Sequence, residues 1–379
     1  MRIAFFSTLD SQSWGGSEEL WSRAAHVLLK QGHEVAFSSS QWRQTAAQLM
    51  KLIEAGAVPH FRTRVQLGPA LRRTLERLRL LQMPHVGWLK KTKPDLVVIS
   101  FAYFSNDPQI ANTCRMLGIP YAILVQSAGA SDWLRRRHLM SFQAAYAHAR
   151  QVFFVSSENR DTLEVNLAAD LSHAQIVDNP FTVRPGATPV WPAVEPFWKI
   201  ACVARINLAS KGQDLLVRVL RQPKWRARPL RFSLWGYDNG DLSLLQKLIS
   251  LYQLNDQIRY EGFSSDIESV WSSNHAFLLP SRLEGNSLAL IEAMYCGRVP
   301  IATNVGRAAE LFEGKDCGFL AMAATVELID DVLERAWRRR HDWQSMGQRA
   351  AMAIRERHSL RPAEDFAALI LSLVSPRRR

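Results

Sequence analysis

The chain alternates short apolar runs with stretches in which apolar residues recur every three or four positions. Several of the short runs are continuous rather than alternating, such as DLVVISF, QVFFVSS and HAFLLPS. Continuous runs indicate strands that are covered on both faces, as in parallel sheets flanked by helices. We therefore predict an α/β fold. The predicted strands span residues 2–7, 34–38, 58–62, 95–101, 121–126, 151–156 and 176–179, followed by 199–205, 231–236, 258–262, 276–280 and 300–303.

A proline-rich stretch separates the two series of strands. Five prolines occur between Pro180 and Pro196 without any apolar period, so this stretch is expected to be neither helix nor central strand. We predict an N-terminal Rossmann-like domain over residues 1–185, a linker over 186–198 and a second Rossmann-like domain over 199–358. Two doubly wound parallel-sheet domains in tandem would face a cleft at the carboxyl ends of their strands.

The amino-acid composition predicts a chain that forms large hydrophobic cores and has no membrane-spanning segment. The chain has 379 residues, of which 47% are hydrophobic, and no run approaches the roughly 20 uncharged apolar residues that cross a bilayer. The opening MRIAFFSTLD becomes polar too soon for a signal peptide. The four cysteines form no C-x-x-C pair, which favours buried thiols in a reducing cytoplasm: Cys114, Cys202, Cys296 and Cys317.

The formal net charge of +12 is unusual. Lys and Arg are concentrated in residues 62–93, 135–137, 338–340 and 377–379. Such a balance suits nucleic acid, anionic lipid or phosphorylated substrates, and a solvated basic surface is the alternative for any single cluster.

The most informative segment is SRLEGNSLALIEAM, residues 281–294. A strand ends, a loop carries Glu284, Gly285 and Asn286, and a helix begins after an N-cap at Asn286 or Ser287. The free N–H groups at the start of that helix, near Leu288, predict an anion site suited to a diphosphate.

Two carboxylates flank this predicted anion site. Glu284 lies in the loop, and Glu292 lies about one and a half turns into the helix. A carboxylate accepts hydrogen bonds from vicinal hydroxyls, so the pair could hold a sugar on one side and a ribose on the other. The alternative is that Glu284 caps the helix and that Glu292 is solvated.

Two further segments follow predicted strands. Arg205 ends a buried-strand pattern, and Lys211 with Gly212 opens the next helix, so the two cations could neutralise a departing diphosphate. Gly15 and Gly16 follow the first strand, where glycines allow positive φ and a close backbone approach. The pattern is not G-x-G-x-x-G, which argues against a dinucleotide site.

These residues resemble the retaining glycosyltransferases of family 4, which have the GT-B fold. That family carries E-x7-E, here Glu284 and Glu292, and R-x5-K, here Arg205 and Lys211. The resemblance is dense from about residue 199 to residue 320 and includes L-P-S, E-A-M, Gly297, Pro300, Gly306 and Glu310.

The resemblance implies a role for each position. Glu284 would bind donor-sugar hydroxyls, Glu292 the ribose, and Arg205 and Lys211 the diphosphate. The remaining donor contacts it implies come from the backbone of Gly285, Asn286, Ser287 and Leu288, from Gly15 and Gly16, and from Gly262 and Phe263 at the nucleobase. It also implies that a C-terminal helix over residues 359–379 packs back on the first domain.

The reaction implied is transfer of a sugar, with retention, from a nucleotide-diphosphate sugar to a hydroxyl acceptor in polysaccharide, glycolipid or other cell-surface glycan biosynthesis. The resemblance also implies that the departing diphosphate helps to deprotonate the acceptor and that neither a metal nor another cofactor is needed. Consistent with this expectation, the chain has no D-x-D motif. Expected partners are a nucleotide sugar and a glycan or lipid-linked acceptor, with no nucleic acid. Expected localisation is cytoplasmic, with membrane contact left open.

Three positions depart from the family pattern. Gln126 stands where many relatives have a histidine near the sugar and acceptor, Arg307 stands at a frequent glycine, and Asn286 stands at a frequent aromatic residue. Gln126 could still hydrogen-bond a hydroxyl, but it cannot carry a proton.

Three alternatives remain open from the sequence. One is a GT-B enzyme that epimerises a sugar nucleotide, and another is a basic nucleic-acid-binding protein, although no recognised nucleic-acid motif is present. The third modifies the favoured function: residues 69–81 place leucines on one helical face among arginines, which suits an anionic membrane surface or packing on the first domain.

Overall fold

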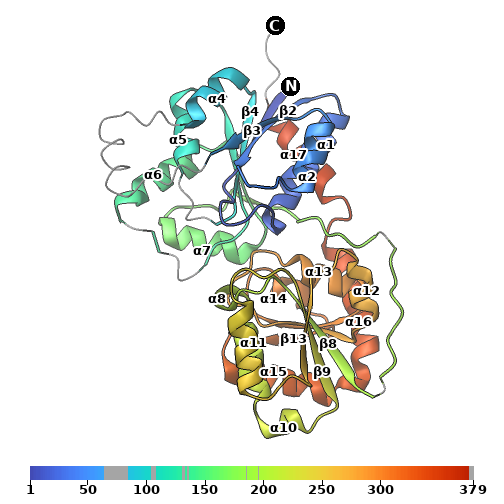
Figure 1. Ribbon diagram of the computed structural model, residues 1–379. Coiled ribbons are helices and arrows are strands. Elements are labelled where there is room, and N and C mark those ends of the chain that lie inside the picture. Colours follow the sequence, from blue (N-terminus) through green and yellow to red (C-terminus); the bar gives the residue numbers. More distant parts are fainter. Residues whose placement is uncertain are drawn as a thin grey trace. The chain divides into compact units, whose positions relative to one another are not determined.

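The computed structural model describes residues 1–63, 84–103, 108–129, 133–134, 136–184, 186–194 and 196–374. These residues form two compact units, shown in Figure 1. The first unit comprises residues 1–180 and 361–379, and the second comprises residues 181–360. Each unit is built on its own parallel sheet, as predicted.

The described part of the first unit contains a seven-stranded parallel sheet of order β3-β2-β1-β4-β5-β6-β7. Apolar runs such as Leu96–Phe101 (β4) are buried on both faces, which explains their continuous pattern. The other strands are β1 (Arg2–Ser7), β2 (Glu34–Ser40), β3 (Val58–Arg62), β5 (Tyr121–Val125), β6 (Val152–Phe154) and β7 (Gln175–Ile176). The helices are η1 (Gly16–Glu18), α1 (Glu19–Lys30), α2 (Ala47–Glu54), α4 (Pro84–Thr92), α5 (Gln109–Met116), α6 (Arg136–Ala147), α7 (Ser157–Leu167) and α17 (Pro362–Ser372).

The C-terminal helix α17 belongs to the first unit although it follows the whole second unit in sequence. Its Phe366 and Ile370 are buried in the same cluster as Trp21 of α1. The Phe366 ring lies edge-on to Phe153 of β6, with ring centroids 5.2 Å apart. Burial of this apolar face fixes the end of the chain on the first sheet.

The described part of the second unit contains a six-stranded parallel sheet of order β10-β9-β8-β11-β12-β13. Its strands are β8 (Trp198–Val203), β9 (Leu230–Trp235), β10 (Ile258–Gly262), β11 (Ala276–Leu279), β12 (Val299–Thr303) and β13 (Phe319–Ala321). The sequence analysis missed β13, because three residues are too few to show a strand pattern. The helices are α8 (Leu208–Lys211), α9 (Gln213–Leu220), α10 (Pro223–Arg226), α11 (Leu242–Leu251), α12 (Ile267–Ser272), α13 (Leu288–Tyr295), α14 (Ala308–Phe312), α15 (Val326–Arg338), η2 (Arg340–Asp342) and α16 (Trp343–Arg357).

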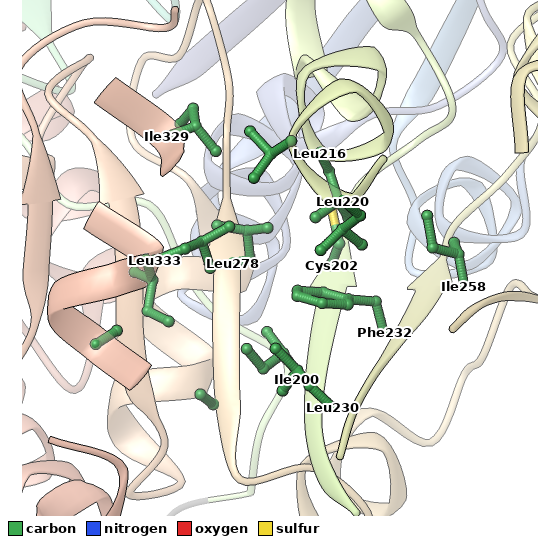
Figure 2. Packing of buried hydrophobic residues seen from close by; sticks show 14 of the residues in the cluster. Ile200, Cys202, Leu216, Leu220, Leu230, Phe232, Ile258, Leu278, Ile329 and Leu333 are labelled. Carbon is green, nitrogen blue, oxygen red and sulfur yellow. The ribbon is translucent and has the colours of Figure 1, made fainter. Parts of the chain in front are cut away.

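Both faces of the second sheet are packed against helices. On one face, Ile200 and Phe232 meet Leu220 of α9 and Leu333 of α15, as Figure 2 shows. On the other face, Leu279 lies in a cluster with residues of α13, α14 and α16. The four cysteines are free and buried, as predicted. Burial raises the pKa of the Cys202 thiol to about 12, so this thiol is protonated at neutral pH.

Residues 181–198, which include the linker predicted over 186–198, lie along the second unit. Val183 is buried in its core, and Trp191 and Val194 pack against another of its clusters. The buried Arg298 donates to the carbonyls of Pro189 and Val190, at 3.1 and 2.7 Å. The described part of this stretch contains neither helix nor strand before β8, as its prolines predict, but it is held by packing rather than free.

Candidate functional site

The candidate site of the second unit lies at the carboxyl ends of β8 and β11. The chain passes from β8 outward to β9 on one side and returns to β11 on the other, so the strand order reverses between β8 and β11. In doubly wound sheets ligands bind at such a switch point. Arg205 and Lys211 follow β8, and residues 281–287 follow β11.

Lys211 and Glu284 form a mostly buried ion pair at this point. The Lys211 Nζ lies 2.6 Å from Glu284 Oε1, and the two side chains are 16% and 8% exposed. Ser281 Oγ donates to the same carboxylate oxygen at 2.7 Å. Because burying two charges costs solvation, the added hydrogen bond is what makes this arrangement tolerable. A carboxylate that is already positioned in this way can accept hydrogen bonds from ligand hydroxyls without first being ordered.

The loop after β11 is tied to the segment after β8. Arg282 makes a bidentate ion pair with Asp214 of α9, with N–O distances of 2.7 and 2.8 Å. The backbone N–H groups of Arg282 and Leu283 both donate to the carbonyl of Ser210 in α8. Gly212 also has no room for a side chain, because a Cβ there would lie 2.1 Å from the Pro280 carbonyl oxygen. The sequence analysis missed Arg282 and Asp214, since no local pattern joins residues 68 positions apart.

The other side of the loop rests on the turn after β12. A Cβ at Gly306 would lie 2.2 Å from the carbonyl oxygen of Gly285, and the φ of Gly306 is +61°. Thr303 Oγ1 donates to the Ser281 carbonyl at 2.6 Å. Only glycine combines this φ with this approach, so Gly306 supports the backbone that carries Glu284 and Gly285.

Helix α13 begins directly after this loop. Its N-cap is Ser287, whose side chain accepts from the N–H of Leu290, rather than Glu284. Asn286 is 6% exposed, and neither its Oδ1 nor its Nδ2 has a hydrogen-bond partner. The predicted backbone donors at Gly285, Asn286, Ser287 and Leu288 therefore lie at a helix N-terminus, where the helix dipole favours an anion.

Glu292 is on α13 and is 5% exposed, so the alternative of a solvated carboxylate is wrong. Its Oε1 accepts two hydrogen bonds from Thr182, one from the backbone N–H at 2.9 Å and one from Oγ1 at 2.7 Å. Arg205 is partly buried after β8, and its carbonyl accepts from Gln213 Nε2. The Lys211 side chain is only 16% exposed, so Lys211 is not a surface cation.

Gly262 ends β10, and Phe263 follows it with its ring stacked on Tyr237, which lies just beyond β9. The ring centroids are 4.0 Å apart, with an angle of 12° between the planes. Both rings are more than half exposed. Tyr237 was not predicted as a site residue. The signal available in the sequence was an aromatic residue just after the predicted strand.

In the first unit, Gly15 and Gly16 lie between β1 and α1, as predicted, but neither has a positive φ. Gly15 is extended, with φ of −163°, because it is the N-cap of η1. The positive φ that glycine allows is therefore not used at Gly15 or Gly16. A Cβ at Gly15 would meet the Gln12 side-chain nitrogen at 2.4 Å.

Gln126 directly follows β5 and is buried, at 6% exposure. Its Oε1 accepts from Asn179 Nδ2 at 3.0 Å, whereas its Nε2 has no hydrogen-bond partner. The structure thus places an amide donor at a strand end, where the sequence suggested a hydroxyl contact.

A cluster of polar residues that was not predicted from the sequence lies at the carboxyl ends of β1, β2 and β3. The Arg62 guanidinium donates to the Ser7 carbonyl at 2.7 Å and to Ser38 Oγ at 3.0 Å, and it lies over the Phe6 ring. Nearby, Glu18 is 3% exposed, and its burial raises its pKa to about 7. The available signal was an acidic residue, Glu18, two positions after Gly16.

The basic clusters have different environments. In the second unit Arg338 pairs with Glu334, and Arg339 pairs with Asp316 and Asp342, so much of this cluster is neutralised. Such pairing does not favour a nucleic-acid surface. Arg135, residues 64–83 and 377–379 lie outside the described residues, and with them the proposed membrane helix over 69–81.

The described residues include no group of three or more His, Cys, Asp or Glu side chains that could hold a metal ion. Within the same residues, no helix combines the length and the hydropathy that a membrane crossing requires.

The fold and the site define a class of protein. Residues 188–352, which lie within the second unit, match the family model "Glycosyl transferases group 1". A putative colanic acid biosynthesis glycosyltransferase, WcaL of Escherichia coli K12, is 30% identical over 148 residues, which are 37% of this chain and 35% of WcaL. The GtfA subunit of a UDP-N-acetylglucosamine–peptide N-acetylglucosaminyltransferase from Streptococcus pneumoniae is 24% identical over 56% of this chain and 42% of that subunit. The chain thus matches less than half the length of these curated relatives.

Solved structures match over nearly the whole chain. Anabaena HepE in complex with UDP has a TM-score of 0.74 at 16% identity, covering 98% of this chain and 100% of HepE. The lipopolysaccharide outer core galactosyltransferase WaaB has a TM-score of 0.70 at 17% identity, covering 98% of this chain and 99% of WaaB. At these identities the likeness concerns the fold, and it confirms the predicted GT-B fold.

The contact between Gly306 and the site loop can be tested against a matched glycine. Gly314 has nearly the same φ, +65° against +61°, but a Cβ there meets no atom within 4 Å. We expect Gly314→Ala to lower the free energy of unfolding by roughly 1–2 kcal/mol through backbone strain. Gly306→Ala should cost roughly 2 kcal/mol more, because it also overpacks the loop. Urea denaturation measures both, and equal losses would contradict the support role of Gly306.

The buried Glu18 carboxyl predicts a pH-dependent stability. Its folded-state pKa of about 7 exceeds the ordinary glutamate pKa of 4.5, so the folded protein holds this proton more tightly between pH 4.5 and about 7. The contribution of Glu18 to the free energy of unfolding therefore falls as pH rises through this window, by about 3 kcal/mol in all. Glu18→Gln cannot titrate, so its stability relative to wild type should increase by that amount from pH 4.5 to pH 8.

Urea denaturation of both proteins across this range measures the difference. Other groups titrate in both proteins and largely cancel, including His85, whose pKa burial lowers to about 4. A stability difference that stays constant with pH would show that Glu18 titrates normally.

Proposed function

We propose that this chain is a retaining glycosyltransferase that moves a sugar from a nucleotide-diphosphate sugar to a hydroxyl acceptor. The observation that carries the proposal is the buried Lys211–Glu284 pair at the switch point of the family-matched unit. Glu292 on the adjoining helix provides a second buried carboxylate. Two ordered carboxylates beside a helix N-terminus suit a ligand that has hydroxyls on both sides of a diphosphate.

Each side chain has a distinct proposed task. Glu284 accepts hydrogen bonds from hydroxyls of the donor sugar, and Glu292 from those of the ribose. Lys211 and Arg205 bind the diphosphate together with the N–H groups at the start of α13. Their positive charge stabilises the negative charge that develops on the diphosphate as it leaves.

In the proposed reaction, the bond between the anomeric carbon and the diphosphate oxygen breaks. The acceptor oxygen bonds to that carbon from the same face, so the configuration is retained. The acceptor proton passes to the departing diphosphate, and no protein nucleophile is needed. We propose that the reaction needs no metal, because Lys211, Arg205 and the helix terminus supply positive charge to the diphosphate.

The named relatives support a narrower role. WcaL is described as acting in colanic acid biosynthesis and WaaB in the lipopolysaccharide outer core, and HepE binds UDP and UDP-glucose. We therefore propose a UDP-sugar donor and an acceptor in cell-surface glycan assembly. Contact with an anionic membrane would bring the protein to a lipid-linked acceptor, and it would depend on the basic residues 62–93.

The test is nucleotide binding by a charge-matched pair of variants. Lys211→Met removes the site cation, whereas Lys315→Met removes a surface cation, 39% exposed, that pairs with Glu356. We expect Lys211→Met to weaken the binding of UDP or GDP about tenfold or more, the worth of a hydrogen bond to a charged group. Lys315→Met should leave the affinity unchanged. Isothermal titration with UDP, GDP and ADP in the presence of EDTA measures this.

A folded wild-type protein that binds none of these nucleotides would overturn the proposal. If one binds, incubation with the corresponding nucleotide sugar and acceptor candidates, followed by NMR, separates transfer from the epimerase alternative. Epimerisation of the donor without an acceptor would replace the transferase with that enzyme.

A further inference from the structure

The chain enters the second unit through a segment that runs along one side of α13. The Phe181 ring packs on Tyr295 with centroids 5.0 Å apart, and the N–H of Gly186 donates to the Tyr295 hydroxyl at 2.9 Å. Between them, Val183 is buried in the core at 4% exposure. The segment is therefore held at both ends by the same side chain of the helix.

A second attachment follows on α12. The guanidinium of Arg184 binds both carboxylate oxygens of Glu268, and the N–H of Arg184 donates to Glu268 Oε1 at 2.9 Å. Thr182 lies between the Phe181 and Arg184 contacts, so its backbone position is determined by its neighbours. Contacts of Phe181, Val183 and Arg184 thus hold the chain on both sides of Thr182.

Thr182 uses this position to contact Glu292. Glu292 and Tyr295 are three residues apart, so they lie on the same face of α13. Both hydrogen bonds from Thr182 go to Oε1 of Glu292, at 2.9 Å from N and 2.7 Å from Oγ1. A carboxylate offers roughly four acceptor positions over its two oxygens, so these bonds use only part of its capacity.

We propose that Thr182 is a positioning residue for the nucleotide site: it holds the Glu292 carboxylate in the orientation in which it binds the ribose hydroxyls. The inference rests on the proposed function, which assigns the ribose to Glu292. A glutamate side chain loses considerable rotamer freedom when it is ordered, and a ligand that must order it binds more weakly. The hydrogen bonds from Thr182 order the carboxylate in advance.

The experiment combines a variant with a change in the ligand. Thr182→Val removes Oγ1 but keeps the shape of the side chain and the backbone N–H, and Thr182→Ser keeps the hydroxyl. Thr182 is exposed in this structure, so either side chain fits. The probes are UDP and 2′,3′-dideoxy-UDP, or GDP and its dideoxy form if the wild type prefers GDP. Isothermal titration gives the affinities, and circular dichroism checks the fold.

We expect Thr182→Val to weaken the binding of UDP roughly three- to tenfold, which is less than the loss of a direct hydrogen bond to a charged group, because Thr182 acts on the ligand through Glu292. Thr182→Ser should restore most of the affinity. With the dideoxynucleotide the loss should shrink to less than about twofold, because the variant and the missing hydroxyls remove the same interaction. A merely structural role would weaken both nucleotides alike.

Four outcomes would overturn the inference. Equal losses for both nucleotides would show that Thr182 acts on the fold and not on the ribose. Unchanged binding of UDP by Thr182→Val would show that the Thr182 hydroxyl does not contribute to binding. Tighter binding would show that it competes with the ligand for the Glu292 carboxylate. A wild-type protein that binds neither UDP nor GDP would remove the proposed function together with this inference, and the wild-type titration alone reveals that case.

Discussion

The site of the second unit depends on one buried ion pair, Lys211 with Glu284. The two residues are 73 positions apart and follow different strands, β8 and β11. A buried charge without its partner is strongly unfavourable, so each residue of the pair requires the other to be in place. Ser281, Arg282 and Gly306 then hold the loop that carries Glu284 from two sides. Folding of the unit and formation of its site are in this sense one process.

The electrostatic logic of the site is a balance of opposite charges. Two buried carboxylates, Glu284 and Glu292, would repel an anionic ligand if they acted alone. Lys211, Arg205 and the N-terminus of α13 place positive charge near the same strand ends, and this charge favours binding of an anionic diphosphate. The carboxylates are then available for neutral hydroxyl groups, which they bind well. A nucleotide sugar offers both kinds of group on one molecule.

The first unit has its own buried polar groups at the carboxyl ends of its strands. Arg62 and Glu18 lie near β1, where the strand order of this sheet also reverses. Gln126, at the end of β5, presents an amide whose Nε2 has no hydrogen-bond partner. The two sheets thus follow the same architectural rule, but the chemistry at their edges differs. The second unit carries the charges expected of a donor site, and the first carries groups that are mostly neutral or paired.

The sequence by itself determined the α/β class, the two series of strands and the residues that lie at the candidate site. Continuous apolar runs indicate buried parallel strands. The spacing from Arg205 to Lys211 and the spacing from Glu284 to Glu292 can be read from the sequence, because each pair is local. Only the tertiary structure decided how these residues are paired. Thr182 and Glu292 are 110 positions apart, and Arg282 and Asp214 are 68 apart, so no periodicity connects them. The short strand β13 and the packing of residues 181–198 likewise depend on neighbours distant in sequence, because burial and hydrogen bonding act through space rather than along the chain.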